Sequence, residues 1–187
     1  MSSFYRNMII GEKYQAKKVI SETEDTSIYI CSKESDLYTV NQYKTEEIKV
    51  KVAEICKGLN PDIHKNFHEM FVHESALYVV FHYYNGIELR KYLVNNNPDI
   101  FERLEIGEKV IDKSIEMDHY PPLIKMTAMQ INNVMVLNND MVSVNFYLDF
   151  NNTPLLLTDT KYIAAAGNIL YELFSDIKNC PNQIDSF

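Results

Sequence analysis

Three histidines and two glutamates lie close together in the chain, and both residue types bind metal ions. His64, His68 and His73 are accompanied by Glu69 and Glu74. Histidines at positions i and i+4 share one face of a helix, where both rings could reach a single ion. This stretch is interpreted as a strand, in which the two side chains stand too far apart. We therefore expect ordinary surface histidines and no metal site.

Nucleophilic catalysis leaves no recognisable pattern in the sequence. The chain has no G-x-S-x-G segment, and Cys31 and Cys56 fall on elements that are predicted to be packed. With Cys180 the cysteines are odd in number and widely spaced, which is typical of reduced, buried thiols in a cytosolic protein. A serine or cysteine hydrolase is therefore disfavoured.

Composition limits the classes of partner. The chain has 187 residues, 46% of them apolar, and a net charge of -8. This length predicts one domain or two small lobes that share a core. No block of Lys and Arg forms a cationic face, so nucleic-acid binding is disfavoured.

No apolar run approaches the roughly 20 residues of a membrane span, and the N-terminus lacks the apolar region of a signal peptide. We expect a cytoplasmic protein without direct membrane insertion, and the abundance of Asn, Ile, Lys and Tyr favours a bacterial source.

The first half of the chain has the alternation typical of strands, with one amphipathic helix inserted. Thr45 is a candidate N-cap, and the apolar residues that follow it are spaced for one face of a helix. Asn60-Pro61 is expected to end that helix. The predicted strands span residues 17–20, 27–31, 37–43, 64–72 and 76–82, and the helix spans 45–59.

The second half is predicted to be mainly helical. A short helix over 88–94 precedes a longer one that Asp99 caps and that ends before Pro121. In the longer helix we expect Leu104, Ile111 and Ile115 to face the core. A hairpin of segments 134–137 and 141–146 follows. The last helix starts at Thr158 or Asp159, and its alanines and glycine predict close packing inside the second lobe.

This order of elements and three local segments resemble the protein kinase family. Residues 76–89 resemble the fifth strand and hinge, 133–137 the segment after the catalytic loop, and 167–173 the buried helix. The resemblance implies an α+β, bilobal protein kinase-like fold. It would have a five-stranded N-lobe sheet with one helix (1–84) and a truncated, mainly helical C-lobe (85–187). By the same resemblance Phe81 is the gatekeeper residue, and the hinge contains Tyr83.

The residues that handle ATP in kinases are replaced in this sequence. Asn41 stands at the lysine position of the third strand, and an amide cannot neutralise phosphate charge. The catalytic base position falls on Ala128 or Thr127, neither of which accepts a proton at neutral pH. The glycines that admit phosphates close to the backbone correspond to Ser21, Thr23 and Thr26, and the metal-binding D-F-G to Phe146-Tyr147-Leu148.

A shifted register restores part of an ATP site. In it Lys44 is the phosphate lysine, Glu54 its helix partner, and Asp149-Phe150-Asn151 a relative of D-F-G, with Asn133 retained. Lys44 would need a β-bulge to reach the strand face of Asn41. No Asp or Glu lies between residues 118 and 140, so the shifted register still lacks a catalytic base. It would permit nucleotide binding without phosphoryl transfer.

The resemblance therefore implies a non-catalytic pseudokinase that acts as a protein-interaction, scaffold or regulatory module, with a protein partner and no cofactor. The dozen or so residues between hairpin and last helix are too few for an activation loop. One alternative is a diverged serine/threonine kinase-like protein that binds ATP and Mg²⁺. Another is a cytosolic subunit of a bacterial membrane or secretion assembly, since the outline resembles the cytosolic pseudokinase part of a type VII secretion component. The 13 tyrosines suit a protein interface and packed hairpins equally well.

Overall fold

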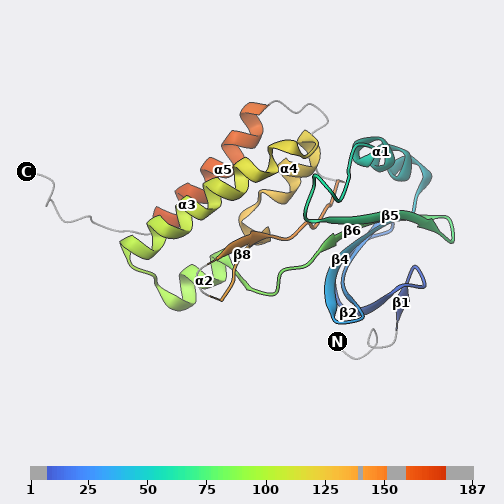
Figure 1. The fold of residues 1–187 in the computed structure, drawn as a ribbon, viewed down its shortest axis with the longest axis horizontal. Coiled ribbons are helices and arrows are strands. Elements are labelled where there is room, and N and C mark those ends of the chain that lie inside the picture. Colours follow the sequence, from blue (N-terminus) through green and yellow to red (C-terminus); the bar gives the residue numbers. More distant parts are fainter. Residues whose placement is uncertain (1–7, 139–140, 151–158, 176–187) are drawn as a thin grey trace, which may run out of the picture.

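A six-stranded antiparallel sheet forms one half of the molecule (Figure 1). The computed structural model describes residues 8–138, 141–150 and 159–175. The strand order is β1-β2-β3-β4-β6-β5. The strands are β1 (Ile9–Ile10), β2 (Tyr14–Glu22), β3 (Thr26–Lys33), β4 (Asp36–Tyr43), β5 (Phe67–His73) and β6 (Ala76–His82).

The predicted count of five strands is wrong, because β1 adds a sixth. This strand has only two residues, and Ile9 and Ile10 pair with Gln15 and Tyr14 of β2. Two residues are too short for an alternating pattern to indicate a strand. The other predicted strands of the first half are all present, although β2 starts earlier and β5 starts later than the sequence indicates.

Helix α1 (Glu46–Cys56) lies between β4 and β5 in the chain, as predicted. Thr45 occupies the N-cap position, although its side chain makes no capping hydrogen bond. Ile48, Val52 and Cys56 are buried, which confirms the amphipathic stripe. The helix ends before Lys57, three residues earlier than predicted.

The other half of the molecule is mainly helical, so the fold is mixed α/β (Figure 1). Among the described residues, no helix has the length and apolar character needed to cross a membrane. A small sheet in the order β7-β8-β9 lies where this half meets the large sheet. The elements are β7 (Ile87–Glu88), α2 (Leu89–Asn96), α3 (Ile100–Glu116), η1 (Met117–His119), α4 (Pro122–Ala128), η2 (Ile131–Asn133), β8 (Val134–Val136), β9 (Val142–Val144) and α5 (Asp159–Phe174).

Helix α3 begins as predicted but turns a different face to the core. Asp99 caps it by accepting hydrogen bonds from the backbone N–H groups of residues 101 and 102. The predicted inward residues Leu104, Ile111 and Ile115 are exposed, and the buried ones include Ile106 and Val110. The helix carries apolar residues on two adjacent arcs, and packing against β9 and α5 selects the arc that periodicity alone leaves ambiguous.

The expectation that the last helix is buried is also wrong. Helix α5 buries Tyr162, Ile169 and Leu173 on one face, whereas Ile163 and Tyr171 are exposed. A Cβ atom added at position 167 would meet nothing within 4 Å, so that glycine does not mark a close packing site. The close approach of α3 and α5 occurs instead at Gly107, where an added Cβ would lie 3.6 Å from Leu170.

Two hydrophobic clusters hold the molecule together. The larger joins α1 and one face of the large sheet to the helical half, and it includes Phe81, Phe146 and Leu173. The smaller lies on the other face of the same sheet, around Tyr14 and Val80. The larger cluster makes the two halves one packed unit, because its members come from both.

The turn after β1 brings the two ends of the large sheet together. Gly11 has a φ of +56°, and a Cβ atom there would lie 2.7 Å from the Phe71 ring of β5. Beside it, Lys13 forms an ion pair of 2.8 Å with Glu69, also on β5. The sheet therefore curls so that the first strands approach the last one, and the smaller cluster fills the curl.

Burial makes Cys31 and Cys56 unreactive. Desolvation raises the pKa of each thiol to about 12, and the thiolate is the reactive form. In the native protein at about pH 8 we expect neither to be alkylated by iodoacetamide, whereas both react in denaturant. Peptide mass spectrometry before and after unfolding measures this. Rapid native labelling of either residue would contradict the packing described. Cys180 lies outside the described residues.

Candidate functional site

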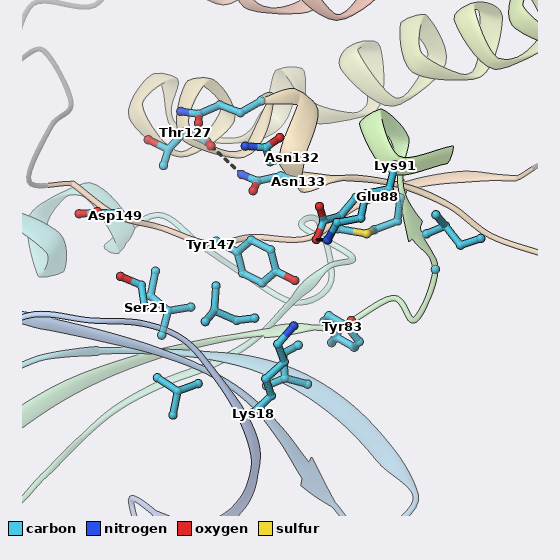
Figure 2. A pocket seen from close by; sticks show the side chains of 18 residues that line it. Lys18, Ser21, Tyr83, Glu88, Lys91, Thr127, Asn132, Asn133, Tyr147 and Asp149 are labelled. Carbon is cyan, nitrogen blue, oxygen red and sulfur yellow. Dashed lines mark hydrogen bonds and ion pairs between the residues drawn. The ribbon is translucent and has the colours of Figure 1, made fainter. Parts of the chain in front are cut away.

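A cleft of about 880 Å³ lies between the large sheet and the helical half. Figure 2 shows side chains of β2 and β3 on one side and of the segment around Asn132 on the other. The residues that line it are Lys18, Val19, Ile20, Ser21, Ile28, Ile30, Tyr83, Gly86, Ile87, Glu88, Lys91, Thr127, Gln130, Asn132, Asn133, Met135, Tyr147 and Asp149.

Three of the candidate residues from the sequence line this cleft: Tyr83, Asn133 and Asp149. Asn133 is buried, and its side-chain Nδ2 donates to the carbonyl oxygen of Thr127 at 3.0 Å (Figure 2). Its amide therefore fixes the backbone turn that precedes β8. Asp149 reaches the cleft from the chain that follows β9.

The other three candidates, Lys44, Glu54 and Phe81, are not part of the cleft lining. Lys44 Nζ donates to the carbonyl oxygen of Thr23, 3.1 Å away. Glu54 is an exposed residue of α1, and Phe81 is completely buried in the larger cluster. The structure therefore does not bring the six candidates together around one cavity.

Asn41 connects the large sheet to the chain that follows β9. It is fully buried on β4, and its Nδ2 donates to the carbonyl oxygens of Val79 at 3.2 Å and Phe146 at 3.1 Å. Its Oδ1 accepts a hydrogen bond of 2.8 Å from the backbone N–H of Leu148. One amide thus holds two residues of the same segment. We call residues 145–150 the bridging segment.

Tyr43, two residues further along β4, extends this connection. Its hydroxyl donates to the carbonyl oxygen of Leu148 at 2.8 Å, and its ring stacks on Phe150 at 6.0 Å between centroids. Burial raises the pKa of the Tyr43 hydroxyl well above its ordinary value, so the group stays a neutral donor. The bridging segment is therefore attached along β4 at consecutive inward-facing positions.

Phe146 fills the space behind the cleft. Its ring stacks on Phe81 of β6 with 4.5 Å between centroids and an interplanar angle of 3°, and it also contacts Tyr120 at 5.2 Å. All three side chains are buried. The Phe146 ring therefore links the bridging segment to β6 and to the helical half.

Asn145 engages the backbone of Tyr84, just after β6. The backbone N–H of Tyr84 donates to Asn145 Oδ1 at 2.8 Å, and Asn145 Nδ2 donates to the carbonyl oxygen of Tyr84 at 3.1 Å. This donor and acceptor are the kind of pair that the edge of a purine base could use. The fully buried amide of Asn145 already satisfies both.

Tyr147 points from the bridging segment into the cleft, between Ser21 and Asn133 in the view of Figure 2. Burial is the largest cause of a pKa far above the ordinary value for Tyr147, and a hydrogen bond with Tyr83 adds to it. Burial also raises the pKa of Tyr83. Two neutral tyrosines therefore line the cleft.

Charges of both signs line the cleft. Lys91 Nζ forms an ion pair of 2.7 Å with Glu88, and Lys18 lies on the β2 side. Asp149 adds a further carboxylate. A triphosphate binds best where cations or a metal concentrate, and this lining does not concentrate positive charge.

The sequence singled out Asn41 but did not predict its hydrogen bonds, and it did not single out Asn145, which bonds the backbone of Tyr84. No local pattern reveals a side chain that bonds backbone groups about a hundred residues away. A usable signal was an amide at a position of β4 that alternation places on the same face as Tyr43, because a buried amide requires several partners.

The histidines are placed differently from the sequence expectation. His64 is buried rather than on the surface, with Nε2 2.9 Å from the carbonyl oxygen of His119 and Nδ1 beside Asn60. It thus ties the turn after α1 to the helical half. His68 and His73 are partly exposed on β5. Within residues 8–138, 141–150 and 159–175, no group of three or more His, Cys, Asp or Glu side chains is placed to hold a metal ion.

Comparisons with known proteins identify no family for the chain. No family model matches it, and no curated protein matches it.

Proposed function

We propose that this chain is a non-catalytic module with a protein kinase-like fold, and that it acts by binding another protein. The observation that carries the proposal is the attachment of the bridging segment to β4 through Asn41. The shifted register of the kinase resemblance assigns the metal-binding aspartate to Asp149. The unshifted register assigns the ATP lysine to position 41 and the metal-binding aspartate to position 146. A neutral amide and an apolar ring occupy these positions.

The contacts of these residues support the absence of phosphoryl transfer. Catalysis of that reaction relies on cations and metals that stabilise developing charge on the phosphate oxygens. Asn41 supplies no charge, and its hydrogen-bonding atoms are already used within the protein. Asn145 engages the Tyr84 backbone pair in the same way. The amide groups of Asn41 and Asn145 therefore hydrogen-bond within the protein.

The connections made by the bridging segment are expected to hold the two halves of the molecule in one arrangement, which suits a protein-binding surface. The bridging segment contacts β4, β6 and the chain after β6, so the large sheet and the helical half are linked at several points. A pre-organised surface loses little conformational entropy on binding, which favours protein recognition.

A thermal melt with and without ATP, ADP and Mg²⁺ tests the proposal. We expect no change in the unfolding midpoint at millimolar nucleotide. A ligand present at about 100 times its dissociation constant would add about 2.7 kcal/mol of stability. In a domain of this size that gain raises the midpoint by several degrees.

A clear upward shift with nucleotide would overturn the proposal in favour of a nucleotide-binding protein. The Asp149→Ala variant then provides the discriminating control, because Asp149 lines the cleft and a loss of the shift would locate the ligand there. Magnesium-dependent phosphorylation that Asp149→Ala abolishes would further show an enzyme. Equal shifts of the unfolding midpoint in the original chain and in the Asp149→Ala variant would place the ligand outside this cleft.

A further inference from the structure

An exposed apolar stripe runs along α3 on the outside of the helical half. It comprises Ile100, Leu104, Ile111 and Ile115, whose exposed fractions lie between 40% and 60%. With about 3.6 residues per turn, these positions lie within one narrow sector of the helix. Single exposed apolar residues are common on protein surfaces, but here four are aligned along one side of one helix.

Helix α5 extends the same surface. Figure 1 shows α3 and α5 side by side, and the backbones approach closely at Gly107. Ile163 of α5 is 67% exposed and lines a surface pocket together with Ile115 of α3. Leu170 lies over Gly107 and is partly buried. We call the α3 stripe together with Ile163 the outer face.

Acidic side chains border the outer face along α3. Glu105, Glu108, Asp112 and Glu116 are exposed and follow one another at helical spacings, on the flank of the stripe. Lys113 pairs with Glu116, whereas no ion pair joins the other three to a cation within the described part of the chain. Like charges at i and i+3 or i+4 repel one another on a helix, and Lys109 and Lys113 lie on the side of this acidic edge that faces away from the stripe.

A second copy of the chain is a poor occupant of this face. The stripe is spaced symmetrically, so two antiparallel copies would align Ile100 with the partner's Ile115 and Leu104 with the partner's Ile111. The same alignment places each Glu108 opposite the partner's Gly107, so that the two Glu108 side chains lie close to each other beside the two-fold axis. The net charge of -8 per chain adds to this repulsion.

We propose that the outer face binds an amphipathic helix of another protein, with apolar residues on one side and lysine or arginine on its flanks. The apolar side would lie along α3 and α5, as in other helix-in-groove complexes. The basic flank would meet Glu105, Glu108 and Asp112, giving the complementary charge that selects a partner and speeds its association. This partner assignment rests on the proposed role as a protein-binding module.

The test uses a fluorescent synthetic helix of about 18 residues, with leucines at i, i+4, i+7 and i+11 and lysines on its flanks. A matched peptide carries glutamate in place of each lysine. Anisotropy titrations use the full chain. We expect saturable binding of the lysine peptide, weaker binding at higher salt, and at least about tenfold weaker binding of the glutamate peptide.

Two sets of variants locate the binding surface. Leu104→Ser with Ile111→Ser should weaken binding at least about tenfold, whereas Val50→Ser on α1 is a matched control that is also exposed and should bind normally. Glu108→Lys with Asp112→Lys should reverse the preference, so that the glutamate peptide binds better. Unchanged melting midpoints verify that the exposed substitutions leave the fold intact.

Several outcomes would overturn the inference. Equal affinity for the lysine and glutamate peptides would contradict the argument from charge. Binding that the Leu104 and Ile111 substitutions do not weaken would contradict the location on the outer face. Concentration-dependent dimers in sedimentation, lost in Leu104→Ser, would assign the face to a second copy. Binding that appears only after deletion of residues 176–187 would assign it to the chain's own C-terminal segment. A nucleotide-induced thermal shift would defeat the proposed function separately, whatever the peptides do.

Discussion

Replacing Asn41 by leucine should destabilise the protein by about 3–5 kcal/mol, among the largest effects available from one substitution. Leucine has a similar size but no polar atoms. The change removes three hydrogen bonds and leaves the backbone N–H of Leu148 without its partner Oδ1 in a buried site. Urea unfolding at equilibrium measures the loss as a lower midpoint.

Asn95→Leu is the matched control for this prediction. Asn95 is exposed in α2, so the same exchange there should alter stability by no more than about 0.5 kcal/mol. If Asn41→Leu were as stable as Asn95→Leu, the attachment of the bridging segment to β4 would not contribute to folding. The support it gives to the proposed function would then disappear.

The strands and helices of this chain are largely readable from its sequence, because each follows from a local periodic pattern. Asp99 as the N-cap of α3 and the stripe of Ile48 and Val52 in α1 are confirmed. The cap and the stripe each depend on residues within one or two helical turns, so the local spacing and chemistry of the side chains determine them. Strand β1 was missed because two residues carry no period.

The buried face of a helix was harder to predict than the presence of the helix. The apolar residues of α3 occupy two adjacent arcs, and the sequence does not state which arc meets α5 and β9. The structure buries Ile106 and Val110 and leaves Leu104 and Ile111 outside. Predicting this choice requires the position of Gly107, since the helices approach closely where it lacks a side chain.

The candidate site was the least predictable part, because its important contacts join residues far apart in the chain. Asn41 and Leu148 are separated by 107 positions, and Tyr84 and Asn145 by 61. Asn133 and Asp149 line the cleft, whereas Lys44 donates to the carbonyl oxygen of Thr23 outside it. Sequence spacing gave candidate positions, but the use of each polar atom depends on tertiary packing.

Phe146→Ala should destabilise the protein by about 3–5 kcal/mol, the usual loss for removing a buried aromatic ring. The ring is completely buried and contacts both Phe81 and Tyr120, so its loss leaves a cavity between the sheet and the helical half. Phe101→Ala on the surface of α3 is the matched control. Phe101 is 73% exposed, and its removal should cost about 0.5 kcal/mol or less.

A double-mutant cycle separates the stacking from the cavity. Phe81→Leu alone and Phe81→Leu with Phe146→Ala complete the cycle, and we expect a coupling energy of about 0.5–1.5 kcal/mol between the two rings. The rings lie 4.5 Å apart and nearly parallel, a geometry in which each limits the other's movement. If the losses in stability of the two single variants add up to the loss of the double variant, the Phe146 ring does not stabilise the protein through its contact with Phe81. Coupled losses would mean that the stacked pair of rings attaches the bridging segment to β6.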